Sequence, residues 1–230
     1  MKKDIYKINN SIDKLINGKN TLFLDKSEFN LVKYKIKANN YQIYTPFKEA
    51  DKIILYSKKI PDVTLFRINT NQILKHQEIL GSILSLNISP SYLGDIIINN
   101  QEYYFFILSD LKEYIKENLT KISNYNITLE TLPLDYLKDY EREYESIKLI
   151  VTSTRIDNVL SKLIKTNRDR ILDKIKDKEI LLNYTILTKA SYILKENDVF
   201  SVRKYGKYIY KGIINTTKRN NYIIEILKYK

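Results

Sequence analysis

The sequence contains no cysteine and only one histidine, His76, among its 230 residues. Disulfide bonds and thiolate metal sites are therefore excluded, and a histidine-based metal centre is not expected. No apolar run approaches the roughly 20 residues that cross a bilayer, and the N-terminus leads into polar sequence instead of the apolar core of a signal peptide. We therefore expect a cytoplasmic protein that acts without a membrane, a metal or a cofactor. A monomer without a small-molecule substrate is a separate expectation, which does not follow from these absences.

Positive charge is concentrated in the C-terminal part of the chain. The whole sequence has a formal net charge of +12. From residue 151 onward, 18 Lys and Arg face 8 Asp and Glu, a net of +10, whereas the first 150 residues hold 21 against 19, a net of +2. A codon bias toward lysine would spread the charge evenly. The asymmetry is instead the electrostatic footprint expected of a nucleic-acid-binding segment.

The first 132 residues read as two small units. Residues 1–60 combine helical and strand patterns without a catalytic motif, so packing or a protein contact is their expected role. Residues 61–132 follow the order β-α-β-β-α-β, which is the split arrangement of ferredoxin-like and RRM-like domains. Its expected strands are 63–68, 93–98, 103–108 and 125–129, its helices are 71–86 and about 109–122, and Asn99-Asn100 forms the hairpin turn. The sequence therefore predicts an α+β protein.

Four consecutive aromatic residues, from Tyr103 to Phe106, occupy the third strand of this pattern. RRM domains stack RNA bases on aromatic side chains of their sheet, so base stacking is one role for this run. Alternation sends only two of the four to each face of a sheet, and aromatic residues in strands usually pack in a core. We expect core packing, with base stacking as the alternative.

Residues 133–147 are rich in Asp and Glu and are predicted to form an acidic linker to a C-terminal domain over residues 148–230. In that domain, Ile156, Val159, Leu160 and Leu163 have the spacing of one apolar helix face, with Ser153 or Thr154 as the N-cap. Asn167 is predicted to cap a second helix, whose apolar stripe is Ile171, Leu172 and Ile175.

Arginines open this second helix. Arg168 and Arg170 lie in its first turn, where the partial positive charge of the helix end disfavours cations and favours a bound anion. Arg170, Lys174 and Lys178 follow at intervals of four and are expected to share a face, where a polyanion would turn their mutual repulsion into attraction. The alternative is a solvated face on which interspersed aspartates screen the cations.

The same segment resembles the S4-like RNA-binding domain. The matching motifs occur in the family's order, as Arg155-Ile156-Asp157, Asn167-Arg168, Ile180-Leu181-Leu182-Asn183 and Asn197-Asp198-Val199. Three positions at which that family has glycine are occupied here by Lys178, Tyr184 and Asn197.

A second resemblance covers nearly the whole chain. His76-Gln77-Glu78-Ile79-Leu80-Gly81-Ser82 and Leu93-Gly94-Asp95-Ile96 are similar to two signatures of the YlmH family. In that family a small N-terminal region, an RRM-like domain and a C-terminal S4-like domain follow one another. Gly81 is expected to allow close packing of its helix.

The two resemblances imply a non-catalytic RNA-binding protein. They imply that it associates with the ribosome and engages large-subunit rRNA and tRNA during the rescue of stalled translation. The residues expected to contact RNA are Arg155, Asn167, Arg168, Arg170, Lys174, Lys178, Lys189, Arg203, Lys204 and Lys207. Arg155 and Arg168 are expected to be exposed phosphate forks, and Arg203, Lys204 and Lys207 a second basic wall.

Three other functions remain open. S4-like domains also accompany pseudouridine synthases, so an RNA-modifying enzyme that uses Asp95 or Asp157 is one alternative, although 150 residues without a glycine-rich cofactor loop leave little room for a catalytic domain. The second alternative is a cell-division adaptor, a role that an older interpretation assigns to the YlmH family. A basic adaptor at the membrane surface is the third, and it is disfavoured because no strongly amphipathic basic helix stands out.

Overall fold

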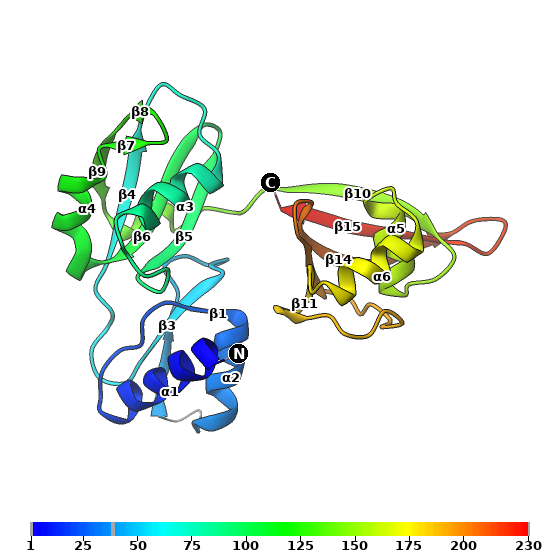
Figure 1. Ribbon diagram of the computed structural model, residues 1–230, viewed down its shortest axis with the longest axis horizontal. Helices are drawn as coiled ribbons and strands as arrows, with labels where there is room; N and C mark the ends of the chain where they lie inside the picture. The colour runs from blue at the N-terminus through cyan, green and yellow to red at the C-terminus, as the bar shows by residue number, and fades with distance from the viewer. Residues whose placement is uncertain (1, 38–39, 230) are drawn as a thin grey trace. The chain divides into compact units, whose positions relative to one another are not determined.

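The computed structural model describes residues 2–37 and 40–229, and it divides between Glu141 and Arg142 into two compact units (Figure 1). The first unit begins with α1 (Lys2–Ile16) and α2 (Lys26–Lys35), which pack on a sheet of β1 (Leu24–Asp25), β3 (Lys52–Tyr56) and β2 (Gln42–Tyr44). A capping box starts α2: the Asp25 carboxylate accepts the Glu28 N–H at 2.8 Å, and the Glu28 carboxylate accepts the Asp25 N–H at 2.9 Å.

The second part of this unit has the predicted β-α-β-β-α-β order. Its elements are β4 (Val63–Asn69), α3 (His76–Ser85), β5 (Leu93–Asn99), β6 (Glu102–Leu108), η2 (Ser109–Leu111) with α4 (Lys112–Asn118), and β9 (Thr128–Leu132). The strands form one antiparallel sheet in the order β5-β6-β4-β9. The two central strands, β4 and β6, are the first and third strands of the motif in chain order.

Three boundaries in this part differ from the sequence prediction. The helix predicted from residue 71 begins at His76, because the Glu78 carboxylate accepts the N–H of Lys75 at 2.7 Å and fixes the helix start there. The helix predicted to reach residue 122 ends at Asn118 and is followed by a small hairpin of β7 (Lys121–Ile122) and β8 (Tyr125–Asn126). The turn lies one residue later than predicted: Asn99 pairs with Glu102, and Asn100 and Gln101 have φ of 47° and 66°.

The aromatic run of β6 is entirely buried, with at most 1% of any of the four side chains exposed. Tyr103 and Phe105 pack in the core beneath α3 and α4. Tyr104 and Phe106 lie on the other face of the sheet, where Phe47 stacks on Phe106 with the ring centroids 5.7 Å apart. The core role is therefore confirmed for this run, and these four rings are not available for base stacking.

Gly94 and Asp95 join the two parts of the first unit. A Cβ at Gly94 would lie 2.8 Å from Cβ of Phe106 and 2.9 Å from Cζ of Phe23, so only glycine lets Phe23 reach the sheet. The Asp95 carboxylate accepts the N–H groups of Asp51 and Lys52, at 2.9 and 3.2 Å. Gly94 and Asp95 therefore serve to pack the two parts of this unit against each other.

Gly81, in contrast, has no described atom within 4 Å of the position of an added Cβ. The close helix packing predicted at this glycine is therefore wrong. Close packing occurs instead at Gly94, where the backbone lies against Phe23 and Phe106.

Apolar residues among the acidic side chains of residues 133–147 anchor part of the predicted linker. η3 (Leu134–Leu137) buries Leu137, and the ring of Tyr140 meets Phe47 edge-on at 5.6 Å. Strand β10 already begins at Tyr144.

The second unit is one antiparallel sheet with two helices. Its elements are β10 (Tyr144–Val151), α5 (Ile156–Leu163), α6 (Arg168–Lys176), β11 (Ile180–Leu182), β12 (Thr185–Ile186), β13 (Val199–Val202), β14 (Gly206–Thr216) and β15 (Tyr222–Tyr229). The strand order is β10-β15-β14-β13-β11-β12. Both helices cover one face, on which Ile156, Leu160 and Ile171 pack against Phe200 and Ile224 (Figure 1).

Three residues that stand where the S4-like pattern has glycine share a left-handed backbone. Lys178, Tyr184 and Asn197 have φ of 59°, 65° and 66°. This conformation favours glycine because it brings Cβ too close to the following carbonyl. The backbone thus has the conformation that the family's glycines would supply, although the side chains differ.

Candidate nucleic-acid interface

Arg155 and Arg168 meet at one buried carboxylate, that of Asp157 in the first turn of α5. Arg168 donates from Nη2 and Nε to Oδ2, at 2.7 and 2.9 Å. Arg155 donates from Nη2 to Oδ2 at 2.9 Å and from Nε to Oδ1 at 3.2 Å. The Asp157 side chain is 0% exposed, whereas those of Arg155 and Arg168 are 36% and 57% exposed.

This pairing corrects the expectation that both arginines are free phosphate forks. The structure brings them together as expected, but a buried carboxylate must be paired, and both guanidinium groups supply that pairing. Neither Nη1 atom hydrogen-bonds to a residue within 2–37 or 40–229. One edge of each guanidinium group therefore holds Asp157, and the other edge remains for an external acceptor.

The electrostatics of Asp157 follow from this geometry. Burial would raise the pKa of the Asp157 carboxyl, but hydrogen bonds from Arg155 and Arg168 outweigh burial and hold that pKa below its ordinary value. The same contact raises the pKa of Arg155. The cluster of two cations and one anion is therefore charged at neutral pH, with a net positive charge.

Beside this cluster, a hollow of about 680 Å³ lies at the turn between α5 and α6. Its lining residues are Ser161, Lys162, Lys165, Thr166, Asn167 and Arg170, so three are basic and none is acidic. Asn167 is the N-cap of α6, as predicted, and its Oδ1 accepts the Arg170 N–H at 2.9 Å. The hollow thus combines the positive end of a helix with three cationic side chains.

The aspartates of α6 do not pair directly with these cations. Within the described part of the chain, no carboxylate lies in ion-pair distance of Lys162, Lys165 or Arg170. No direct ion pair in this part of the chain therefore supports the alternative in which interspersed aspartates neutralise the cations.

The predicted stripe of Arg170, Lys174 and Lys178 is wrong as a single helix face. α6 ends at Lys176, and Lys178 lies beyond it in a left-handed conformation. Lys174 donates to Glu179 at 2.7 Å and lies 5.5 Å from the ring centroid of Tyr205. Only Arg170 remains at the hollow.

The remaining predicted residues lie at three other places. Arg203 and Lys204 are exposed in the β13–β14 turn, beside the C-terminal end of α6, where the Arg203 N–H donates to the Glu179 carbonyl at 2.9 Å. Lys189 is exposed in the loop after β12 and precedes Ala190, whose carbonyl accepts the Asp157 N–H. Lys207 lies on the sheet face opposite the helices, so it does not belong to one wall with Arg203 and Lys204.

Sequence reasoning missed Lys162 and Lys165. Lys162 lies in the last turn of α5, and Lys165 lies two residues before Asn167, the N-cap of α6. Their signal was this position at the end of one predicted helix and just before the start of the next. Lys165 also has a φ of 51°, and the adjacent Thr166 N–H donates to the Ser161 carbonyl at 2.9 Å, which closes the turn around the hollow.

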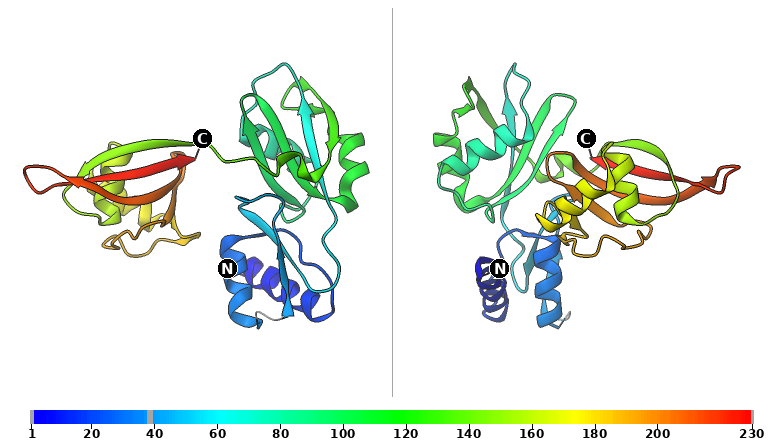
Figure 2. Two further views of the ribbon diagram at one scale, coloured as in Figure 1. Left: turned by 180° about the vertical axis from the view of Figure 1, so that it is seen from behind. Right: turned by 45° about the vertical axis from the view of Figure 1, so that its right-hand side comes forward.

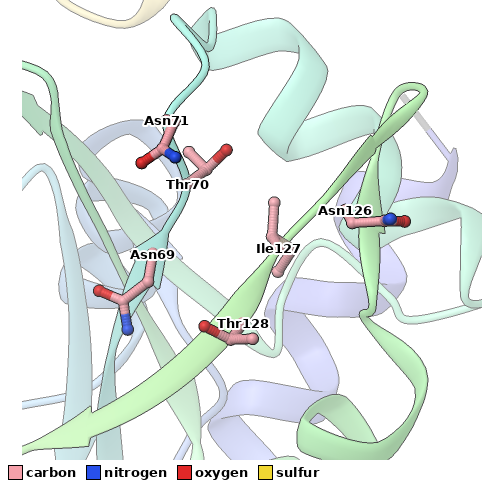
Figure 3. Close-up of a pocket in the computed structure, with 6 residues that line it drawn as sticks. All are labelled: Asn69, Thr70, Asn71, Asn126, Ile127 and Thr128. Atoms are coloured by element: carbon pink, nitrogen blue, oxygen red, sulfur yellow. The ribbon is translucent and has the colours of Figure 1, made fainter.

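A second hollow, of about 340 Å³, lies at one end of the sheet in the first unit (Figure 3). It is lined by Asn69, Thr70, Asn71, Asn126, Ile127 and Thr128, none of which is charged. In Figure 3 the Asn126 side chain extends away from those of Asn69 and Asn71, so the amides do not converge. We assign no ligand to it.

No helix within residues 2–37 and 40–229 is long and apolar enough to cross a membrane. In the same residues, no group of three or more acidic or histidine side chains is placed to hold a metal ion.

Comparison with known proteins finds similarity both in sequence and in fold. Residues 62–136 match the family model described as "Putative RNA-binding domain in YlmH". A curated relative from Bacillus subtilis (strain 168), named "Ribosome-associated protein quality control protein P2", is 22% identical over 155 residues, which are 67% of this chain and 60% of the relative. The matched region therefore spans less than two thirds of that relative.

Among solved structures, "Cell division protein ylmH from Streptococcus pneumoniae" is similar in fold, with a TM-score of 0.50 and 18% sequence identity. The similarity covers 60% of this chain and 94% of that chain. At this identity the likeness concerns the fold alone, and it agrees with the α+β class predicted from the sequence. Together the matches confirm the resemblance to the YlmH family stated from the sequence motifs, and residues 62–136 match the RNA-binding domain of that family.

Proposed function

We propose that this protein binds structured RNA, without catalysing a reaction on it, through the α5–α6 turn of an S4-like C-terminal domain. The observation that carries the proposal is the hollow of about 680 Å³ lined by Lys162, Lys165 and Arg170 at the N-cap of α6. Cations around free helix N–H groups suit the phosphates of an RNA backbone, and they need no base-edge contacts. The left-handed residues at the family's glycine positions support the S4-like assignment.

The cellular context of the proposal comes from the relatives. The Bacillus subtilis relative is named as a ribosome-associated quality control protein, and the matching family model is described as an RNA-binding domain. We propose that this protein likewise acts in the cytoplasm as a monomer, on rRNA or tRNA of the large ribosomal subunit, during the rescue of stalled translation.

The geometry of two aspartates argues against the enzyme alternative. Asp95 accepts two backbone N–H groups and joins two parts of the fold, and Asp157 pairs with two arginines. Each carboxylate thus already has a structural role. Neither has the exposed, poised geometry of a general base or nucleophile.

The test is the salt dependence of RNA binding by a charge-removal variant. Lys162→Ala/Lys165→Ala/Arg170→Ala should bind a structured rRNA fragment more weakly, and the slope of log K against log salt should fall by about 1 per removed cation. The matched control is Lys33→Ala/Lys37→Ala/Lys48→Ala, which removes the same charge from exposed positions of the first unit.

The control variant should retain the wild-type slope. Equal slopes for the wild type and the α5–α6 variant would rule out the proposed surface. Absence of any salt-sensitive RNA binding by the wild-type protein would rule out the function itself.

A further inference from the structure

The C-terminal end of α6 meets the turn between β13 and β14. We call these two segments, residues 174–179 and 203–206, the α6–turn site. The Arg203 N–H donates to the Glu179 carbonyl at 2.9 Å and joins the segments. Figure 2 (right) shows α6, in yellow, in front of the orange strands of this unit. Because α6 has nine residues with a rise of about 1.5 Å each, the site lies about 13 Å along the helix from the basic hollow.

Two lysines of the α6–turn site have a left-handed backbone, with φ of 59° at Lys178 and 71° at Lys204. The Lys178 N–H donates to the Ile175 carbonyl at 3.0 Å, and the Glu179 N–H donates to the Lys174 carbonyl at 2.9 Å. This is the Schellman motif at the end of a helix, and Lys178 occupies the position that is usually glycine. A long side chain at positive φ is strained, and such strain is concentrated at functional sites.

Three cations of the site are exposed, namely Lys178, Arg203 and Lys204. Within residues 2–37 and 40–229, no carboxylate lies in ion-pair distance of these three. The Glu179 carboxylate instead accepts from Lys174 at 2.7 Å. This hydrogen bond lowers the pKa of Glu179, and the charges of Arg203 and Lys204 lower it further. The cations therefore act together on one small region.

The net charge of the α6–turn site is positive. Its cations are Lys174, Lys176, Lys178, Arg203 and Lys204, and its carboxylates are Asp177 and Glu179. Five cations against two carboxylates leave a net charge of +3. This outweighs the partial negative charge of about 0.5 at the C-terminal end of a helix. The site is therefore complementary to a polyanion.

Tyr205 lies among these cations. Nζ of Lys174 is 5.5 Å from its ring centroid, and 42% of Tyr205 is exposed. The Tyr205 N–H donates to the Val202 carbonyl at 3.0 Å, and the Tyr205 carbonyl accepts the Tyr208 hydroxyl at 2.8 Å. These bonds fix the turn while the ring remains accessible, so little conformational freedom is lost when a flat group stacks on it.

The composition of the site favours RNA over an acidic protein segment. Protein interfaces have an apolar core, but Tyr205 alone among residues 174–179 and 203–206 is an exposed hydrophobic residue. A flat ring among cations is instead the composition of surfaces that bind single-stranded nucleic acid.

We propose that the α6–turn site binds an unpaired nucleotide of the RNA whose backbone the hollow holds, with Tyr205 stacking on its base and Arg203 and Lys204 binding its phosphates. This inference rests on the proposed RNA-binding function and names the class of RNA selected, a structured RNA with unpaired nucleotides beside the structured part. The hollow suits phosphates whether or not the bases are paired, whereas a ring stacks only on a base that is free of its duplex. Since one helix carries both sites, binding at one raises the effective concentration at the other.

The first test compares two RNAs. The wild type should bind an RNA duplex with an unpaired uridine tail more tightly than the same duplex with blunt ends. Tyr205→Ala should lower the affinity for the tailed RNA by about 5- to 150-fold, the range for loss of one base–aromatic stack. Its affinity for the blunt duplex should not change. The variant should fold, because alanine keeps the backbone hydrogen bonds of the turn.

Two other tyrosine variants are the controls. Tyr205→Phe keeps the ring and should retain tail binding. Tyr125→Ala removes a ring of matched exposure, 41%, from β8 of the first unit, and it should leave both affinities unchanged. Lys162→Ala/Lys165→Ala/Arg170→Ala should weaken binding of both RNAs.

A second test uses Lys178→Gly to separate binding from stability. Glycine is the usual residue at this position of the motif, so the variant should unfold at a higher temperature than the wild type. Loss of the cation should nevertheless weaken binding of the tailed RNA, and the slope of log K against log salt should fall by about 0.7, the value for one phosphate of a single strand. A more stable variant with an unchanged slope would remove Lys178 from the site.

Equal affinity of Tyr205→Ala and the wild type for the tailed RNA would overturn the α6–turn site and leave the hollow untouched. Weaker binding of poly-glutamate by this variant, without weaker binding of the tailed RNA, would also overturn it, since the site would then take an acidic protein. Wild-type protein that binds neither RNA would instead refute the proposed function.

Discussion

Arg155 and Arg168 bind the same oxygen atom: their Nη2 atoms lie 2.9 and 2.7 Å from Oδ2 of Asp157. Arg155 is the N-cap residue of α5, and Arg168 is the first residue of α6. The buried carboxylate therefore connects the starts of two helices and fixes the turn between them, which carries the hollow.

Asp157→Asn should destabilise the C-terminal unit by about 2 kcal/mol. Removing one partner of a buried ion pair typically costs about 3–5 kcal/mol, and the partial exposure of both arginines reduces that cost by solvent screening. Urea unfolding measures the difference. Asp169→Asn is the matched control, because Asp169 is exposed and should change stability little; a loss of similar size there would show that the net charge, not the pairing, matters.

The pairing also predicts how stability depends on pH. Because the folded pKa of Asp157 lies below its unfolded value of about 3.9, the carboxylate stabilises the fold fully above that value and loses this effect as pH falls through the folded pKa. The difference in unfolding free energy between wild type and Asp157→Asn should thus be constant near neutrality and shrink below about pH 4. A difference that persists unchanged into that acid range would contradict the assignment.

Gly94→Ala should destabilise the first unit by about 1–3 kcal/mol, the usual cost of overpacking, because the new methyl would clash with Phe106 and Phe23. Amide hydrogen exchange should be faster in β3, whose first residue, Lys52, donates its N–H to the Asp95 carboxylate. Gly81→Ala provides a control of opposite sign. It lies in the exposed interior of α3 with open space around it, and should stabilise by about 0.5–1 kcal/mol.

Asn167 allows stability and RNA binding to be separated. Asn167→Ala removes the N-cap of α6 and should cost about 1 kcal/mol. Asn167→Asp keeps an equally good cap but adds an anion to the basic hollow, so it should fold normally and bind RNA more weakly. Paired thermal unfolding and filter-binding measurements check both; equal RNA affinity of Asn167→Asp and wild type would mean that phosphate does not enter the hollow.

Much of the fold follows from local sequence patterns. The apolar spacing from Ile156 to Leu163 gave the position of α5, and alternation with turn residues gave the β-α-β-β-α-β order. The capping interactions of Asp25 and Asn167 are local, so they could be predicted as well. The end of α6 was missed because a spacing of four continues through Lys178, although the backbone turns there to a left-handed conformation.

The site was harder to predict because its contacts are not local. Nothing near Arg168 in the sequence shows that its partner is Asp157, a residue of the preceding helix. The sequence also does not show which face of a strand is buried. Tyr208 and Tyr210, which lie between Lys207 and Lys211 in the sequence, point into the core, while Lys207 faces the other way. The helices or strands that pack on one face of a strand decide which of its alternating side chains remain accessible.

Strand β15 lies between β10 and β14, so the first strand of the C-terminal unit is bonded to its last one. During synthesis, β10 and the two helices emerge from the ribosome long before Tyr229 does. Their sheet cannot be completed until that final strand is released, and long-range pairing of this kind forms slowly. The nascent helices therefore remain without their full packing surface until β15 has been synthesised, and we expect this unit to fold only after Tyr229 has left the ribosome.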